Sequence, residues 1–450
     1  MFNHDQNLWI HQAQLLEENG ILRPYNIGIK AGKITTITTE DDRHEYTHIL
    51  DANGWILLPG VIDPQVHFRE PGLEHKEDLS TASHACARGG VTSFLEMPNT
   101  RPLTTNQTTL DDKLQRAAQK SLVNYGFFIG ATRDNLAAIN QVSPTCGIKV
   151  FMGAMHGDLL IDDAEYLERI FATGDRLIAV HAENQQRIHQ RRAQLADRYH
   201  LPEIHSEIQD EQAALQATAL AVHLAIKYQR RLHILHLSTA LEVEFLRQHK
   251  RPWITAEVTP QHLLLHRSAY HQLGALAQMN PPLRTPHDNQ VLWQGLKEGI
   301  IDFMATDHAP HTLAEKARPY PESPSGMPGV ETLLPVMLTQ AKAGQCTLNQ
   351  VVNWLSTNVA AAYGIANKGK IAPGYDADLV LVDWEHYHPV RREDLQTKCG
   401  WSPFEGWELT GWPQVTIVGG QIVYNQGQFN EQARGKALQF LADTIYTNPT

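Results

Sequence analysis

The sequence has few cysteines. Only four occur in 450 residues, and no two of them form a Cys-x-x-Cys pair: Cys86, Cys146, Cys346 and Cys399. Scattered cysteines of this kind indicate neither a disulfide framework nor a zinc site built from thiolates. We therefore expect a chain that folds without disulfides, as proteins of the reducing cytoplasm do.

Long apolar runs and an excess of basic residues are also lacking. No uninterrupted apolar stretch reaches membrane-spanning length, and residues 1–12 lack the basic-then-apolar order of a signal peptide. The 38 basic residues are outnumbered by 49 acidic ones, for a net charge of -11. This balance argues against nucleic acid or an anionic membrane as the main partner, but a local cluster could still bind a small anion. We expect a cytoplasmic protein that acts on a small molecule.

The composition is that of an ordinary folded protein, with 42% apolar and 19% charged residues. In the middle of the chain, strand-like stretches alternate with helix-like ones such as 164–171, preceded by the N-cap candidates Asp162 and Asp163, and 211–228. Eight strands, the number that closes a (β/α)₈ barrel, are predicted at 55–62, 91–97, 124–130, 148–152, 177–181, 232–237, 253–258 and 301–306.

Both ends of the chain show short strands separated by turns, at 8–11, 26–30, 33–37, 377–383 and 413–424. Strands at opposite ends of a chain can pair into one satellite sheet. We therefore predict an α/β fold in which residues 57–370 form a TIM barrel. Residues 1–56 and 371–450 then form a small β-sandwich-like domain.

Polar residues recur where the predicted barrel strands end. Gln65 and His67 are two residues apart and project to the same side of a strand, while His181 and His236 each close an apolar run. A lone histidine is more often a hydrogen-bonded or surface residue than a ligand, and most of the 24 histidines are interpreted in that way. Recurrence at strand ends favours a metal site for these, and imidazoles with one carboxylate suit zinc better than iron or manganese.

Lys149 lies inside the apolar stretch 148–152, where a buried ammonium group would cost several kcal/mol unless it were paired or neutralised. One interpretation is a lysine that reaches solvent or is held by a carboxylate. The other is an amine that has reacted with carbon dioxide to give a carbamate, whose two oxygens can bridge two divalent metals.

Asp307 belongs to the stretch 305–311, in which Pro310 and two histidines crowd the same turn. A helix cap or turn former is the ordinary role of such an aspartate. At a strand end beside a metal, however, its carboxylate can bind the metal and accept the proton of an attacking water.

A second group of side chains suits an anionic substrate that contains an amide. Arg69 offers a bidentate fork for a carboxylate, Asn99 and Asn280 offer amides, and His311 offers an imidazole. Both asparagines stand next to a proline, where an Asx-turn is the common alternative.

Eight stretches together resemble the dihydroorotases of the amidohydrolase superfamily, over nearly the whole chain: 66–72, 97–100, 147–153, 181–183, 236–239, 280–284, 305–311 and 398–404. The resemblance implies a TIM barrel with a flanking β domain and the interconversion of N-carbamoyl-L-aspartate and L-dihydroorotate in pyrimidine synthesis. It also implies a loop near the substrate at 312–329.

The resemblance assigns roles to the candidate residues. His67, His181, His236 and Asp307 bind metal and carboxylated Lys149 bridges, while the substrate is held by Arg69, Asn99, Asn280 and His311. A metal-activated water then attacks the ring amide carbonyl, and Asp307 carries the proton to the leaving nitrogen.

The chain departs from the family pattern at two positions, since glutamines, Gln65 and Gln261, stand where the family usually has histidines. This chain resembles a bacterial branch of dihydroorotase-like proteins that also has glutamine at the first of these positions. An amide oxygen is a weaker zinc ligand than an imidazole, so the expected count is one or two zinc ions per chain.

Two further interpretations stay open. An allantoinase or hydantoinase would use the same chemistry on another cyclic ureide. A metal-depleted scaffold that associates with aspartate carbamoyltransferase would explain Gln65, although a scaffold would need none of the retained ligands. In each case we expect a homo-oligomer.

Overall fold

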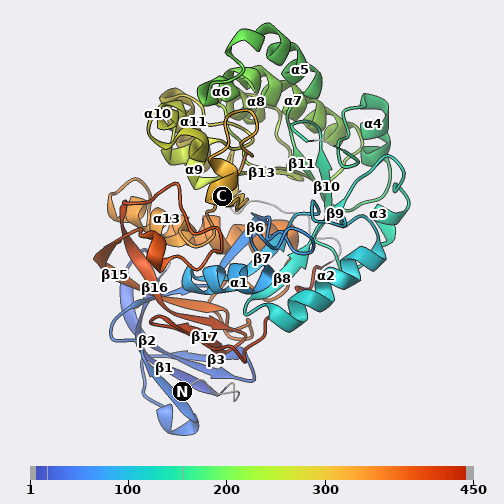
Figure 1. Ribbon diagram of the computed structural model, residues 1–450. Coiled ribbons are helices and arrows are strands. Elements are labelled where there is room, and N and C mark those ends of the chain that lie inside the picture. Colours follow the sequence, from blue (N-terminus) through green and yellow to red (C-terminus); the bar gives the residue numbers. More distant parts are fainter. Residues whose placement is uncertain (1–6, 18, 156, 442–450) are drawn as a thin grey trace.

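The computed structural model describes residues 7–17, 19–155 and 157–441, and it consists of a barrel of parallel strands ringed by helices beside a large mixed sheet (Figure 1). The barrel strands are β6 (Val61–Val66), β7 (Val91–Glu96), β8 (Asn124–Phe127), β9 (Ile129–Gly130), β10 (Ile148–Phe151), β11 (Ile178–His181), β12 (Leu232–Ile234), β13 (Ile254–Val258) and β14 (Phe303–Met304).

These strands close into one ring. Hydrogen bonding joins β6, β7 and β8 in one sheet and β9 through β14, in sequence order, in another. Only Phe128 separates β8 from β9 along the chain, so the two form one side of the barrel. The segment after β14 returns to β6, where the His67 amide donates to the His308 carbonyl at 2.8 Å. The predicted TIM barrel is confirmed.

Helices alternate with the barrel strands and cover them from outside (Figure 1). They are α1 (Leu79–Arg88), α2 (Gln107–Lys120), α3 (Ala138–Gln141), α4 (Ala164–Ala172), α5 (Gln185–Gln194), α6 (His205–Ile208), α7 (Glu211–Lys227), α8 (Ala240–His249), α9 (Pro260–Leu264), α10 (Tyr270–Leu273), α11 (Pro286–Lys297), α12 (Leu313–Lys316), α13 (Leu333–Lys342), α14 (Leu348–Val352) and α15 (Asn358–Tyr363). Asp163 caps α4 by accepting from the Tyr166 amide at 2.7 Å, as predicted.

The two ends of the chain share one nine-stranded sheet, which confirms that they pair. Its strands are β1 (Leu8–Leu16), β2 (Leu22–Lys30), β3 (Lys33–Thr38), β4 (His48–Asp51), β5 (Ile56–Pro59), β15 (Leu379–Pro389), β16 (Glu408–Val418), β17 (Gln421–Asn425) and β18 (Gln428–Phe429). The joint is the antiparallel pair of β5 and β15. Both ends contribute to its buried core, for example Ile10 and Ile27 from one end and Leu381 and Ile417 from the other.

Two predicted strands are wrong because each is divided at a glycine. The run 55–62 is divided: β5 belongs to the nine-stranded sheet, and the barrel strand β6 begins after Gly60 and includes Gln65. Gly60 permits this crossing because a Cβ there would lie 2.2 Å from the Thr92 hydroxyl. The stretch 413–424 is also divided, because Gly419 and Gly420 turn with φ of 53° and 78° and make β16 and β17 a hairpin.

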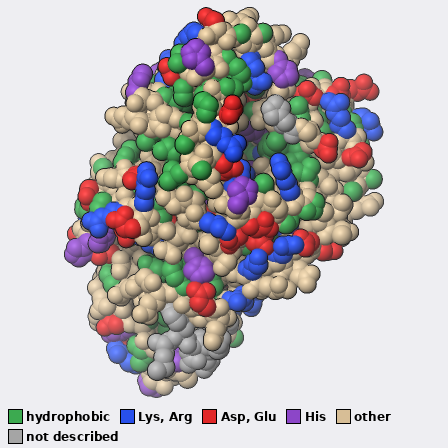
Figure 2. Space-filling model, in the orientation of Figure 1, with side chains coloured by type: hydrophobic (Ala, Val, Ile, Leu, Met, Phe, Trp, Pro, Cys, Tyr) green, Lys and Arg blue, Asp and Glu red, His purple; other side chains and the backbone are tan. Residues whose placement is uncertain are grey.

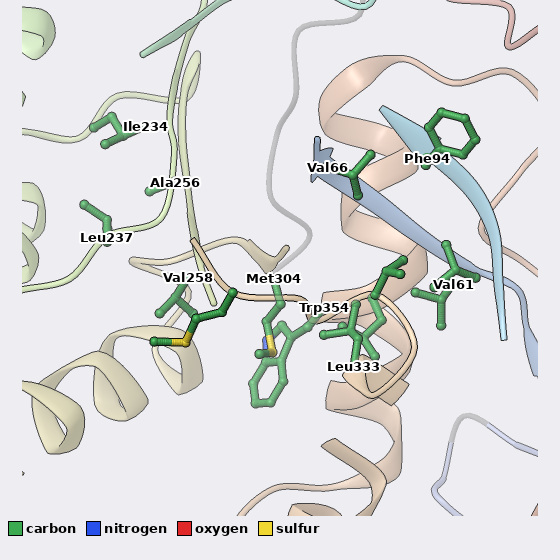
Figure 3. Packing of buried hydrophobic residues seen from close by; sticks show 14 of the residues in the cluster. Val61, Val66, Phe94, Ile234, Leu237, Ala256, Val258, Met304, Leu333 and Trp354 are labelled. Carbon is green, nitrogen blue, oxygen red and sulfur yellow. The ribbon is translucent and has the colours of Figure 1, made fainter. Parts of the chain in front are cut away.

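A continuous hydrophobic cluster holds the barrel strands in place. Val61 and Val66 of β6, Phe94 of β7 and Leu333 of α13 belong to it, together with residues of β12 and β13 across the barrel (Figure 3). All six residues of β6 are buried, and Gln65 is among them.

The face of the molecule drawn in Figure 2 carries acidic and basic side chains interspersed, with no single sign covering it. Within the part of the chain that the structure describes, no helix combines the length and the apolar character that crossing a membrane requires.

Candidate active site

All ten site residues predicted from the sequence line one cavity of about 210 Å³ at the carboxyl ends of the barrel strands: Gln65, His67, Arg69, Asn99, Lys149, His181, His236, Asn280, Asp307 and His311. Three of them, Arg69, His236 and Asp307, have positive φ (68°, 38° and 48°). Such strained backbone in non-glycine residues is typical of functional sites.

His67 is oriented toward Asp307 by Asn99. The Asn99 side-chain oxygen lies 2.7 Å from His67 Nδ1 and accepts its proton, so Nε2 of the neutral ring is left with a lone pair. That nitrogen lies 3.1 Å from Asp307 Oδ1. Burial lowers the pKa of His67, which favours the neutral ring. Two lone pairs that face each other at this distance call for a cation between them.

Asp307 is positioned by the end of β6. Gln65 donates its amide to Asp307 Oδ1 at 3.0 Å. The Asp63 carboxylate is fully buried and accepts from two backbone N–H groups, that of Thr306 at 3.1 Å and that of Gln65 at 3.3 Å. It thereby ties β6 to the segment that carries Asp307. Burial raises the pKa of Asp63 to about 7. Sequence reasoning assigned no role to Asp63, although it begins the segment that contains Gln65 and His67.

His181 and His236 form a second pair, with His181 Nδ1 lying 2.9 Å from His236 Nε2. His181 Nε2 donates to Glu183 at 2.8 Å, so its Nδ1 keeps a lone pair that faces His236. Burial lowers the pKa of His236 well below its usual value. Glu183 fixes the orientation of the His181 ring, as a carboxylate does for a histidine that binds a metal, and its spacing from His181 was the signal that could have identified it.

Lys149 is buried, and its amine has no hydrogen-bond partner in the described part of the chain. It lies 4.4 Å from the centre of the Phe151 ring. Burial lowers its pKa to about 7, although the charges of Asp307 and Glu257 oppose the shift. The amine therefore neither reaches solvent nor forms an ion pair with a carboxylate of the described residues, so the ordinary interpretation of this lysine is wrong.

The candidate ligands lie in two pairs. Within residues 7–17, 19–155 and 157–441, no three side chains of the His, Cys, Asp and Glu types are close enough together to hold a metal ion. The pairs His67–Asp307 and His181–His236 share the cavity with Lys149. Their imidazole and carboxylate atoms are ligands that zinc accepts, and His236 Nδ1 and the Lys149 amine, both buried, have no hydrogen-bond partner among the described residues.

Arg69 brings a buried positive charge to the other side of the cavity. Its Nε donates to the Pro310 carbonyl at 3.2 Å, and its Nη2 lies 3.3 Å from His311 Nε2. No carboxylate among the described residues forms an ion pair with it. Burial lowers the pKa of Arg69 to about 10, so the guanidinium remains charged at neutral pH.

His311 is held between two polar groups. Lys76 donates to Nδ1 at 3.1 Å, so Nε2 carries the ring proton and donates to the Ser325 carbonyl at 3.0 Å. Trp401 donates to the His311 carbonyl at 2.8 Å, which gives the stretch 398–404 its place behind the site.

Asn280 and Gln261 differ in their relation to the cavity. The Asn280 side-chain oxygen accepts from His205 Nε2 at 2.8 Å, and sequence reasoning did not identify His205. Gln261 is buried and lies outside the residues that line the cavity, where it donates to the Thr306 carbonyl at 3.2 Å.

The stretch 312–329 reaches the cavity through Ser325 and Gly326. The buried Lys316 donates to the Pro324 carbonyl at 2.9 Å and to the Gly326 carbonyl at 3.1 Å, which holds this stretch in its place. The segment predicted to lie near a substrate therefore lies against the predicted site.

Known proteins resemble this chain over almost its full length. The model of the Amidohydrolase family matches residues 56–423. The dihydroorotase of Methanosarcina acetivorans is 36% identical over 437 residues, which cover 94% of this chain and 93% of that protein. The dihydroorotase of Halobacterium salinarum is 37% identical over 380 residues, covering 84% and 88%. Among solved structures, the L-hydantoinase (dihydropyrimidinase) of Arthrobacter aurescens matches with a TM-score of 0.91 and 27% identity over 97% of this chain and 100% of its own.

Proposed function

The chain belongs to the amidohydrolase family, and from that membership we propose that it is a zinc-dependent dihydroorotase, which interconverts N-carbamoyl-L-aspartate and L-dihydroorotate. The curated relatives support a cyclic amide hydrolase of this kind, since they bear the name dihydroorotase and cover most of the chain. A cytoplasmic role in pyrimidine synthesis and a homo-oligomeric state belong to the same proposal.

The observation that carries the proposal is the unpaired charge of Arg69. A buried guanidinium is costly unless an anion compensates it, and Arg69 has no carboxylate partner among the described residues. L-dihydroorotate carries a carboxylate on its ring, whereas unsubstituted hydantoin and dihydrouracil carry none. The site therefore favours dihydroorotate over the substrates named for the structural neighbours.

The metal that we propose fits the donor set. His67, Asp307, His181 and His236 would hold zinc, and Lys149, as a carbamate, would supply oxygen ligands. Carbamate formation needs a neutral amine, and a pKa of about 7 provides one at neutral pH. When bound, zinc lowers the pKa of a water molecule and polarises a carbonyl group.

The remaining steps belong to the protein's own side chains. Asp307 accepts the proton of the attacking water and later delivers it to the ring nitrogen that leaves. Gln65 holds Asp307 by its 3.0 Å hydrogen bond, which gives this glutamine a role apart from metal binding. Arg69 and His311 hold the substrate carboxylate, and Asn99 acts by orienting His67.

A comparison of substrates tests the proposal. Zinc-loaded protein is assayed for ring opening of L-dihydroorotate, hydantoin, dihydrouracil and allantoin, alongside Arg69→Gln and the exposed control Arg391→Gln. We expect the highest kcat/KM on L-dihydroorotate and a loss of about 10²–10³ fold in Arg69→Gln, the cost of a charged hydrogen-bonded contact. Hydantoin turnover should change little in that variant.

Two outcomes contradict the proposal. A higher kcat/KM on hydantoin or allantoin would assign the protein to another cyclic ureide. No turnover of any of the four by zinc-loaded protein, together with stable co-purification with aspartate carbamoyltransferase, would favour the scaffold.

A further inference from the structure

A second cavity, of about 590 Å³, lies at the opposite end of the barrel from the candidate active site. It is lined by residues that precede β10, β11 and β12, whereas the active-site residues follow the strands. Three separate segments, 143–147, 174–177 and 228–231, form most of its wall. Nothing in the proposed reaction uses this end of the molecule.

Arg230 is the unusual residue in this wall. It is only 2% exposed, and among the residues that the structure describes none is a hydrogen-bond partner of the three guanidinium nitrogens. An arginine that follows a helix commonly donates to the last carbonyls of that helix, but the Arg230 side chain donates to none at the end of α7. A guanidinium does not lose its proton at neutral pH, so a buried charge remains that no carboxylate of the described residues pairs with.

Two more arginines line the same cavity, Arg176 and Arg231. Arg231 donates to the Ala362 carbonyl at 2.9 Å. Asp175 is the one carboxylate among the described lining residues, and it forms no ion pair with Arg230. Burial lowers the pKa of Arg230 to about 10, and the charges of Arg176 and Arg231 lower it further against the effect of Asp175. The cavity thus concentrates positive charge on a protein whose net charge is negative.

We propose that this cavity binds a small molecule that carries a phosphate group. Arginine forks match the several oxygens of a phosphate, and three of them supply more donors than a single carboxylate can accept. The volume suits a ligand of nucleotide size, and the rings of Tyr228 and Phe440 in the wall offer apolar surface for the rest of such a ligand. The site is separate from Arg69 and from the candidate metal ligands.

Calorimetric titration of the full, zinc-loaded chain tests this site with inorganic phosphate, adenosine 5′-monophosphate and uncharged adenosine as probes. We expect the two phosphate-bearing probes to bind and adenosine not to bind. Arg230→Gln should weaken that binding at least about tenfold, as loss of charge-assisted hydrogen bonds does, while Arg391→Gln leaves it unchanged. Tighter binding of the nucleotide than of phosphate would identify a nucleotide as the ligand, and equal binding would identify free phosphate.

Two controls keep the test decisive. Without phosphate, Arg230→Gln should retain its kcat on L-dihydroorotate and keep or raise its Tm, because it removes an unpaired buried charge. Arg176→Gln provides a second variant of the same cavity if Arg230→Gln does not fold. Equal affinity for phosphate in the wild-type protein and these variants would place the anion elsewhere, and absence of binding to the wild-type protein would likewise overturn the proposal.

Discussion

Replacing Lys149 by methionine should stabilise the metal-free protein while it destroys the proposed metal site. Methionine is unbranched like lysine and apolar, so it can fill the same buried space without a charge. The pKa of Lys149 falls from 10.5 to about 7 on burial. At about 1.36 kcal/mol for each pKa unit, this difference corresponds to about 5 kcal/mol of unfavourable free energy in the folded state.

The sign of the pH dependence follows from the lowered pKa. Below pH 7 the lysine is protonated in both the folded and the unfolded states, so the whole cost is present. Between pH 7 and 10.5 the unfolded state binds the extra proton and the cost falls, and it vanishes above 10.5. Thermal unfolding of metal-free Lys149→Met should therefore show a Tm above that of the wild-type protein at pH 7, and the advantage should shrink toward pH 10.

A matched control is the same change at another buried lysine. Lys113 is as buried as Lys149, but its amine lies 2.9 Å from Glu96 and forms an ion pair. Lys113→Met leaves Glu96 buried without its partner and should lower stability by about 3–5 kcal/mol. A Tm that falls equally in both variants would refute the conclusion that Lys149 is unpaired.

The same Lys149 variant tests the carbamate. Elemental analysis should find fewer than two zinc ions per chain, and kcat/KM on L-dihydroorotate should fall to background. Lys149→Ala should behave in the same way toward metal. Normal metal content and activity in either variant would remove Lys149 from the site.

Three further predictions concern the metal. Glu183→Gln removes the carboxylate that orients His181, so zinc affinity should fall about 10–100 fold; unchanged affinity in a competition titration with a chelating dye would contradict that role. Gln65→His should raise the zinc content per chain, because an imidazole is a better ligand than an amide oxygen, but it should also lower kcat by removing the hydrogen bond to Asp307. Chelation should abolish ring opening and added zinc should restore it; full activity of metal-free protein would exclude a metal-dependent reaction.

The sequence determined the fold class and the membership of the candidate site. Eight apolar stretches alternating with helices predict a barrel, and the carboxyl ends of parallel barrel strands meet at one mouth. Polar residues that follow separate strands must therefore share one space, and all ten predicted residues line the same cavity. Their roles in metal and substrate binding remain predictions.

Only the tertiary structure decided how these residues are paired. Asn99 was predicted to touch substrate, but its contact with His67 depends on how β6 and the segment after β7 pack together. The separation of β5 from β6 at Gly60 was equally hidden, since an apolar run does not show which of two sheets each half joins.

Burial without a partner is likewise a property of the folded chain. The apolar stretch 148–152 singled out Lys149 but left its pairing open, and nothing in the sequence distinguished Arg230 from a solvated arginine. Their positions became informative because segments far apart in the sequence enclose them, while no carboxylate of the described residues comes close enough to form a hydrogen bond or an ion pair with them. The sequence thus specifies which side chains meet at the carboxyl ends of the barrel strands, while packing decides which charges are left for a ligand to neutralise.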